Sequence, residues 1–404
     1  MEATNLNGDL IAHVMRNKRV GRLIRSSTPR LLLISAVFFL SSFPSYAQEL
    51  PRSSSRVDAE DNHAFVVEAK QIVAKATRET VQWNGPSTGP PAPKGKVIAL
   101  VTEDLRNGGI IGVAQGAREA AIAMGWTLKV FDGGGTSSGR TKALGDALAI
   151  KPDGLVLCGS DAVENNSALA AFAGLGSPVV GWHTAAQSGP VAGTPLAMNV
   201  TSEPIKVAQL AALAAVAQSD GHAGVVILTD SKYSIATAKA KAMEEIIRAC
   251  KDCTLLEVRD VALADSSERM PAITNQLLRQ YGKRWTHTLA INDLYFDYAI
   301  TALTAAGIPA DGLSLISAGD GSASAFLRIQ AKTYQTATVA EPLNQQGWQV
   351  MDELNRLIVG QVVSGFVAPI HLVNVDSTGA AGSRNFQYDP ENGYRDRYRK
   401  IWNP

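Results

Sequence analysis

The residues that could do chemistry in this chain are polar side chains that follow a series of apolar runs. They lie at residues 104–109, 132–135, 160–161, 183–184, 230–231, 292–293, 320–321 and 341. Each group follows a predicted strand, and in open α/β sheets ligands bind beyond the carboxyl ends of the strands. Helix N-termini also prefer Asp, Asn and Ser, and we expect four residues in or beside these segments to be caps: Ser160, Asp161, Asp293 and Ser322.

These side chains form hydrogen bonds but include no nucleophile and base at a recognisable spacing. Carboxylates can accept two hydroxyls at once, amide and ammonium groups can bind further hydroxyls, and aromatic faces can cover C–H surface. The set is typical of a site for a polyhydroxyl ligand. It predicts no catalytic residue.

Enzyme and cofactor motifs are weak in this sequence. Residues 135–139 satisfy G-x-S-x-G, but residues 132–134 separate them from the preceding strand, whereas a nucleophile elbow turns sharply at the strand end. The glycines at 133–135 lack the ordered G-x-G-x-x-G of dinucleotide sites. The six histidines are scattered and no acidic loop has calcium-binding spacing, so we predict neither a metal nor another cofactor.

Alternating strands and helices must position the polar side chains. Apolar runs predict strands at 97–101, 127–131, 154–158, 178–182, 224–228, 254–258, 288–291, 313–317 and 336–340, mostly with helical stretches between them. Continuous apolar runs are typical of buried parallel strands, and short loops between strand and helix fit doubly wound sheets. Nine or ten strands favour an α/β fold with two doubly wound parallel sheets.

An export signal precedes this alternation. Six basic residues between positions 16 and 30 are followed by the apolar run Leu31–Leu40 and by the small residues Ser45 and Ala47. This pattern predicts a signal peptide over residues 1–47, cleaved near Ala47, and a periplasmic product. An uncleaved anchor is the alternative, but about ten apolar residues are short of the roughly 20 that cross a bilayer. Met15 is an alternative start.

The chain after the signal is slightly acidic. The signal holds six of the 38 Lys and Arg residues and two of the 37 Asp and Glu residues, which leaves 32 against 35. A net charge near −3 argues against nucleic acid or an anionic membrane surface as a partner. Residues 48–95 are predicted to form a leader helix, over 61–80, and a Pro-rich linker that tethers it to the main body.

The cysteines predict one local disulfide. Cys250 and Cys253 form C-K-D-C between a predicted helix and a predicted strand, and Cys158 stands alone. The motif has no second pair or histidine partners for structural zinc. In an oxidising compartment we expect the pair to be a disulfide, and a redox-active pair is the alternative.

Between Lys96 and Val375 the chain resembles the type I periplasmic binding proteins of the ribose-binding group, the sugar receptors of bacterial ABC importers. The motifs that carry the resemblance are Q-G-A-R-E-A at 115–120, K-P-D-G at 151–154, S-D-A-V at 160–163, P-V-V at 178–180, A-I-N-D at 290–293, G-D-G at 319–321 and A-T-V-A-E at 337–341. The resemblance implies two lobes joined by three hinge crossings near Val200, Glu341 and Pro369. Residues 96–200 plus 342–368 would form the first lobe, and residues 201–341 plus 369–404 the second.

The resemblance also implies a binding site. Asn107, His183 and Thr184 would line the first lobe, Lys239, Asn292 and Asp320 the second, and Glu341 the hinge. Asn292 and Asp320 match the sugar-binding Asn and Asp of the family. Ribose receptors have an Asp-Arg pair at His183-Thr184, an Arg at Lys239, a Gln at Glu341 and two aromatic residues at Gly109-Ile110. Since lysine is a point charge and not a bidentate fork, we expect a ligand other than ribose.

Two rings could replace the missing aromatic residues. Trp182 ends a predicted strand and Tyr295 begins a predicted helix, so each is a candidate to stack on the ligand and a candidate for core packing.

The resemblance implies a monomeric receptor that captures a monosaccharide or polyol and delivers it to an ABC permease in the inner membrane. The alternative is a sensory protein that presents the same ligand to a chemoreceptor or sensor kinase. A sugar-responsive repressor shares this fold, but the signal peptide and the linker occupy the place of its helix-turn-helix.

Overall fold

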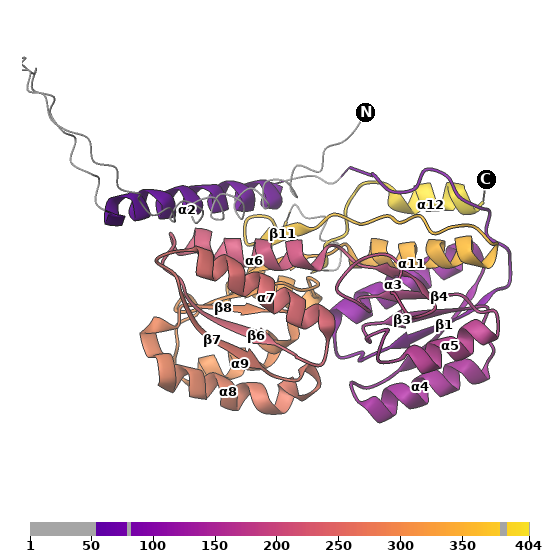
Figure 1. Cartoon of the computed structure of the whole chain (residues 1–404), viewed down its shortest axis with the longest axis horizontal. Helices are drawn as coiled ribbons and strands as arrows, with labels where there is room; N and C mark the ends of the chain where they lie inside the picture. Colours follow the sequence, from indigo (N-terminus) through magenta and orange to yellow (C-terminus); the bar gives the residue numbers. More distant parts are fainter. Residues whose placement is uncertain (1–53, 79–81, 380–385, 404) are drawn as a thin grey trace, which may run out of the picture.

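Two α/β lobes lie side by side in the computed structural model (Figure 1), which describes residues 54–78, 82–379 and 386–403, with side chains from residue 62 onward. The predicted fold class, two doubly wound sheets of mainly parallel strands, is confirmed. The predicted signal peptide and its cleavage point lie outside the described residues.

The first lobe contains a parallel five-stranded sheet of order β2-β1-β3-β4-β5. Its strands are β1 (Val97–Thr102), β2 (Thr127–Asp132), β3 (Gly154–Cys158), β4 (Val179–Trp182) and β5 (Leu196–Val200). Helices α3 (Gly108–Met124), α4 (Ser137–Ala149) and α5 (Asn166–Gly174) connect them. Strand β5 was not predicted, because its apolar stretch is only three residues long before Asn199 interrupts it.

The second lobe contains a six-stranded sheet of order β11-β10-β9-β8-β6-β7. Its strands are β6 (Gly224–Thr229), β7 (Thr254–Asp260), β8 (His287–Ala290), β9 (Ser314–Ser317), β10 (Gln335–Ala340) and β11 (His371–Asn374), of which only β11 is antiparallel to its neighbour. The connecting helices are α7 (Ser234–Ala249), α8 (Ser266–Tyr281), α9 (Leu294–Ala305) and α10 (Ala323–Gln330).

Three chain segments pass between the lobes. One joins β5 to α6 (Pro204–Gln218), one joins β10 to α11 (Leu343–Ile358), and one joins α11 to β11. Because α11 packs on α3 and on strands of the first sheet, each segment connects one lobe to the other.

The carboxyl-terminal helix corrects the expected lobe assignment. Residues 369–404 were assigned to the second lobe, and β11 does join the second sheet, but α12 (Tyr394–Trp402) packs on α11 and α3 of the first lobe. The rings of Trp402 and Trp348 stack at 5.3 Å, and Trp402 Nε1 donates to Asp352 at 2.7 Å. Aromatic residues at helical spacing give α12 an apolar face that only a packed partner can bury.

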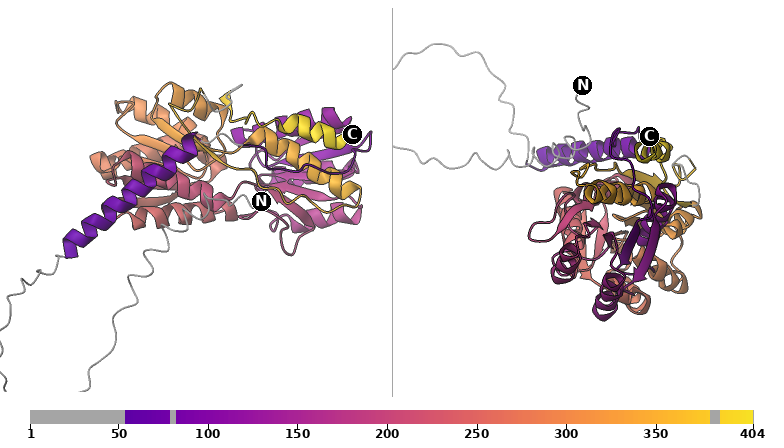
Figure 2. Two further views of the ribbon diagram at one scale, coloured as in Figure 1. Left: turned by 90° about the horizontal axis from the view of Figure 1, so that it is seen from above. Right: turned by 90° about the vertical axis from the view of Figure 1, so that its right-hand side faces the viewer.

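The leader helix packs against the second lobe, whereas the sequence predicted only that a linker tethers it to the main body. Helix α2 (Ser54–Arg78) lies against α6 and β11 of the second lobe and runs obliquely across it (Figure 2). The predicted apolar face is confirmed, because Phe65, Val66, Ala69 and Ile72 are buried in the core of that lobe.

The predicted disulfide pair lies under this helix. The structure joins Cys250 to Cys253, and Cys158 is a buried free thiol. In the turn between the paired cysteines, Lys251 N donates to Asn62 Oδ1 at 2.8 Å and Asp252 Oδ2 accepts from Asn62 Nδ2 at 2.7 Å. The closed turn therefore presents the groups that hold the amino-terminal part of α2.

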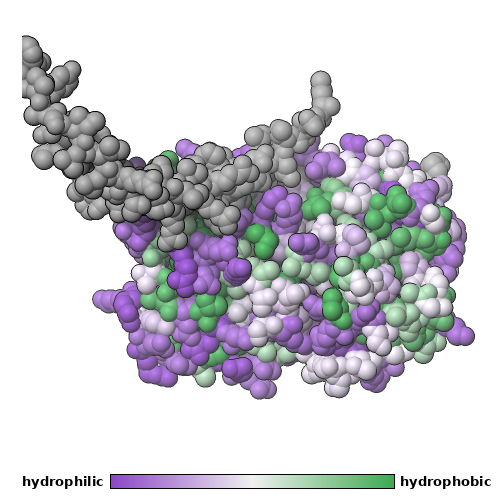
Figure 3. All heavy atoms as spheres, viewed as in Figure 1, coloured by the Kyte–Doolittle hydropathy of each residue, from purple (hydrophilic) through white to green (hydrophobic). Residues whose placement is uncertain are grey.

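The outer surface mixes polar and apolar residues over both lobes on the face shown in Figure 3. Among the described residues, every helix is too short or too polar to span a bilayer.

Candidate ligand-binding cleft

A cavity lies between the lobes at the carboxyl ends of the strands, with an empty volume of about 670 Å³ that includes space open to solvent. Six of the nine residues expected at the site line it: Asn107, Trp182, His183, Lys239, Asn292 and Asp320. This is the position at which open α/β sheets bind ligands.

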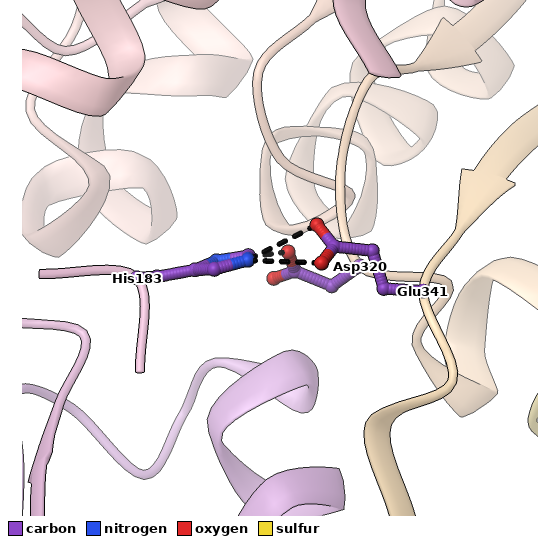
Figure 4. Close-up of side chains that lie close together, drawn as sticks. All are labelled: His183, Asp320 and Glu341. Carbon is purple, nitrogen blue, oxygen red and sulfur yellow. Dashed lines mark hydrogen bonds and ion pairs between the residues drawn. The ribbon is translucent and has the colours of Figure 1, made fainter. Parts of the chain in front are cut away.

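The imidazole of His183 faces two buried carboxylates that lie next to each other, those of Asp320 and Glu341 (Figure 4). Its Nε2 is 3.0 Å from Glu341 Oε1, and its Nδ1 is 3.7 Å from Asp320 Oδ1. His183 follows β4 and Asp320 follows β9, and both have positive φ, at 52° and 32°. Residues other than glycine seldom adopt this conformation, and such strain clusters at ligand sites.

Asn292 orients the carboxylate of Asp320. Its Nδ2 donates to Asp320 Oδ2 at 2.8 Å, and its Oδ1 accepts from Leu294 N at 2.9 Å. Asp320 has two oxygens, and the only hydrogen bond it accepts from described residues is the one from Asn292. A carboxylate has about four acceptor positions, so most of the capacity of Asp320 is open toward the cavity.

Glu341 belongs to the hinge and not to the cavity wall. Its Oε2 accepts from Ser202 N at 3.0 Å and from Gln346 Nε2 at 2.9 Å. Burial alone raises the pKa of Glu341, but the adjacent His183, with help from Lys239 and Gln346, holds that pKa well below its ordinary value. A charged Glu341 therefore fixes the imidazole of His183 at the point where two hinge segments meet.

Trp182 lines the cavity and is also packed. Its ring stacks on the His183 imidazole at 3.7 Å with 12° between the planes, and its Nε1 donates to Gln346 Oε1 at 2.8 Å. One ring face is thus covered by His183.

Two expected site residues point elsewhere. Thr184 is turned into the first lobe, where its Oγ1 donates to Asn199 Oδ1 at 3.0 Å. Tyr295 is fully buried in the core of the second lobe, and its hydroxyl donates to Val261 O at 2.7 Å. Neither residue lines the cavity in this structure, because the Thr184 hydroxyl is bound inside the first lobe and the Tyr295 ring is packed in the core of the second.

Lys239 brings a positive charge to the cavity. Its side chain projects from the buried face of α7, and the residue is 3% exposed. Within the described ranges, no hydrogen-bond or ion-pair partner accompanies its ammonium group. The ammonium group faces the cavity with its donors unused, so a ligand acceptor there could form a hydrogen bond with it.

Sequence reasoning missed Glu103 and Tyr233, which also line the cavity. The polar segment predicted after the first strand begins at residue 104, one residue after Glu103. Opposite this edge, Gly109 approaches Asp320 so closely that a Cβ atom at Gly109 would lie 2.2 Å from Asp320 Oδ2. The two lobes therefore touch across the cleft in this structure.

One group of side chains has the donor types of a metal site. His183, Asp320 and Glu341 each offer an atom within 4.8 Å of the others. A nitrogen and two carboxylates can ligate a divalent cation. However, Lys239 places a positive charge in the same cavity, and the hinge already supplies donors to Glu341. These features fit a hydroxylated ligand better than a cation.

Comparisons with known proteins agree with this geometry. Residues 98–361, the greater part of the chain, match a family model described as a periplasmic binding protein domain. No curated protein matches the chain in sequence.

Solved structures of the same fold include two ABC transporter solute-binding proteins. One, from Agrobacterium vitis with bound allitol, is 20% identical with a TM-score of 0.60, covering 71% of this chain and 98% of its own. Another, from Mycobacterium smegmatis with bound glycerol, is 18% identical with a TM-score of 0.63, covering 72% of this chain and 99% of its own.

An ABC sugar transporter subunit from Rhodobacter sphaeroides is 21% identical with a TM-score of 0.59, covering 70% of this chain and 98% of its own. At these identities the structures support the fold, while the family model spans both lobes and the cleft between them. The chain belongs to the periplasmic binding protein family.

Proposed function

We propose that this protein captures a sugar or polyol between its lobes in the periplasm and delivers it to an ABC permease in the inner membrane. The observation that carries the proposal is the unused hydrogen-bonding capacity of buried groups in the cavity. Asp320 has open acceptor positions, and Lys239 has donors without an acceptor among the described residues. A neutral ligand with several hydroxyls supplies both kinds of partner at once.

The charges of the cleft favour a neutral ligand over an anion. Asp320 and Glu341 lie near the position that Lys239 faces, and a ligand carboxylate would meet their negative charge. A hydroxyl can donate to Asp320 while its neighbour accepts from Lys239. The solved relatives with bound allitol and bound glycerol support this ligand class.

The shape of the cleft favours an open-chain polyol over a sugar ring. Pyranose rings are commonly held between aromatic faces, whereas Trp182 has one face on His183 and the start of α3 carries Gly108 and Gly109. An acyclic polyol depends less on stacking, since its binding comes mainly from hydrogen bonds.

Calorimetric titration of the mature protein tests the ligand class. We expect heat of binding with allitol or another open-chain polyol and weaker binding of ribose. A ligand at 100 times its Kd stabilises the fold by about 2.7 kcal/mol, so a thermal-shift screen of polyols, pentoses and hexoses provides a second readout. Absence of binding throughout this panel would refute the proposal.

The same proposal includes a cleaved signal peptide and a protein that does not catalyse a reaction. Residues 1–47 would be removed on export, which the intact mass of the exported protein tests. The protein would bind without a reaction, so the ligand should be recovered chemically unchanged after incubation.

A sensory role is the second candidate. A complex named XylFII–LytSN contains a protein of the same fold, 15% identical with a TM-score of 0.59, so the fold accepts a protein partner. Uptake of labelled polyol separates the roles. Loss of uptake on deletion of the protein supports transport, while intact uptake with a lost cellular response supports sensing.

A further inference from the structure

Glu103 is a cavity residue whose bonds reach both lobes. Within the first lobe its carboxylate accepts from Arg140 Nη1 at 2.9 and 3.0 Å and from Ser160 Oγ at 2.6 Å. Ser160, expected to be a helix cap, is instead a donor to Glu103. Glu103 is 4% exposed and Arg140 is 2% exposed, so this is a buried ion pair.

The remaining donors come from the second lobe. Tyr233 Oη donates to Glu103 Oε1 at 2.8 Å, and Lys232 Nζ lies 3.1 Å from the same oxygen. Both residues immediately precede α7, the helix that carries Lys239. The bonds therefore connect the loop after β1 directly to the element that presents a ligand-binding candidate.

Glu103 has no capacity left for a ligand hydroxyl. Five contacts fall on two oxygens, and a carboxylate has about four acceptor positions. Burial alone raises the pKa of Glu103, but hydrogen bonds from Ser160 and Tyr233 and the charges of Arg140 and Lys232 lower it below the ordinary value. The group is therefore a saturated anion at the wall of the cleft.

We propose that Glu103 is a latch that stabilises the closed arrangement of the lobes through Tyr233 and Lys232 without contacting the ligand. The inference rests on the proposed function, because closure serves to retain the captured solute. Two further hydrogen bonds near Glu103 also connect the first lobe to the second. Ser234 Oγ donates to Asp161 Oδ2 at 2.8 Å, and Arg106 Nη1 donates to Ala264 O at 3.4 Å.

The division of partners makes the latch reversible. When the lobes separate, Glu103 keeps Arg140 and Ser160 in its own lobe, so opening does not strand a buried charge. Tyr233 and Lys232 then form hydrogen bonds with water in place of Glu103. The net free energy lost is modest, because a hydrogen bond to water replaces each bond to the carboxylate. Such a latch biases closure by about tenfold per bond and still permits release.

Distance measurement between spin labels on the two lobes tests the latch. Lys142 on α4 and Gln276 on α8 are exposed, and each can be replaced by cysteine for labelling because Cys158 is buried and the other two cysteines are paired. Without any polyol, we expect the wild-type protein to populate a short interlobe distance. Tyr233→Phe should reduce the ratio of short to long distances by about tenfold.

Tyr281→Phe is the matched control, because the Tyr281 hydroxyl bonds to Glu257 and Leu256 within the second lobe. It should leave the distance distribution unchanged. Glu103→Gln removes the negative charge that Lys232 and Tyr233 bind but keeps one amide oxygen that can accept from Tyr233. It should also reduce the short-distance population, and its effect and that of Tyr233→Phe should be less than additive in the double variant, because the two residues share one contact.

Equal distributions for Tyr233→Phe and the wild type would overturn the latch. Tyr233→Phe leaves the Glu103–Arg140 pair intact, so a folding defect does not obscure the result, and an unchanged melting temperature checks this. Addition of allitol is a separate arm. Failure of allitol to change the wild-type distances counts against the proposed ligand class and leaves the latch comparison intact.

Discussion

Two buried carboxylates line the same cavity, and their surroundings differ. Glu103 receives five contacts from donors of both lobes, whereas Asp320 accepts one hydrogen bond from Asn292 and lies 3.7 Å from His183. Burial is alike, at 4% and 3% exposed. The number of protein donors therefore distinguishes a carboxylate that holds the protein together from one that is free to bind a ligand.

The comparison also separates two uses of positive charge. Arg140 is buried against Glu103, and the pair is complete without a ligand. Lys239 is equally buried but has no acceptor in the part of the chain that the structure describes. A donor without a protein acceptor can gain a hydrogen bond when a ligand binds, whereas the Glu103–Arg140 pair has little to gain.

Replacing Asp320 should have the largest effect. Asp320→Ala removes acceptors for two ligand hydroxyls, each bond worth about 1.5 to 3 kcal/mol, so affinity for allitol should fall by at least about a hundredfold. Calorimetric titration measures the loss, and the melting temperature should change little.

Ser322→Ala is the control for a capping role. Ser322 Oγ accepts from Ala325 N at 3.2 Å and caps α10, so its loss should cost about 1 kcal/mol of stability and leave affinity unchanged. A lowered melting temperature with unchanged affinity in Asp320→Ala would move Asp320 out of the site.

Replacing Lys239 should have the next largest effect. Lys239→Met keeps the length of the side chain and removes its donors, so affinity should fall by about tenfold to a hundredfold. Lys239 makes no hydrogen bond or ion pair with the described residues, and the substitution removes only its longer-range attraction to Glu341, so the stability of the unliganded protein should stay close to that of the wild type.

Lys241→Met is the matched control on the same helix, since Lys241 is exposed. It should change neither affinity nor stability. Reduced stability of unliganded Lys239→Met would indicate that Lys239 has a structural partner and does not await a ligand.

The fold followed from local patterns, and so did the strand-end positions of Asn292 and Asp320, whereas their expected role in ligand binding comes from the family resemblance and stays a prediction. Asn292 and Asp320 come directly after strands, where the topology of an open sheet determines their position. Glu103 was not predicted because its role depends on partners that are far away in the sequence. Arg140 is 37 residues away and Tyr233 is 130 residues away.

Side-chain direction explains why Thr184 and Tyr295 do not line the cavity. The positive φ of His183 redirects the chain, and Thr184 then points toward Asn199 and away from the cavity. Tyr295 begins a helix whose first turn faces the core. Neither direction can be read from the spacing of residues along the sequence.

The contribution of Glu103 to the stability of the protein should depend on pH, because its carboxylate is paired in the folded state. Its pKa is lowered in the folded protein, so its contribution to stability is fully present above the unfolded value of 4.5 and is lost as pH falls through the folded pKa. Glu103→Gln should therefore lower the free energy of unfolding at pH 7, and the difference from the wild type should narrow below about pH 4.5.

Urea unfolding at pH 7, 5 and 3.5 measures this difference. Glu245→Gln on the exposed face of α7 should match the wild type throughout. If the free energy of unfolding of Glu103→Gln were lower than that of the wild type by the same amount at all three pH values, the contribution of Glu103 to stability would come from packing and not from its charge.

The smallest effect on binding is expected for Tyr295. Tyr295→Phe removes the hydrogen bond to Val261 O in the core and leaves the carbonyl without this donor. The cost should be about 1 to 3 kcal/mol of stability, because a buried acceptor loses its partner. Affinity for allitol should stay within twofold of the wild type, since the ring is fully buried and the hydroxyl points into its own lobe. Calorimetry and urea unfolding of the same preparation separate the two quantities. A fall in affinity beyond the loss of folded protein would return Tyr295 to the cleft, and would show that a hydroxyl already paired inside one lobe still takes part in binding.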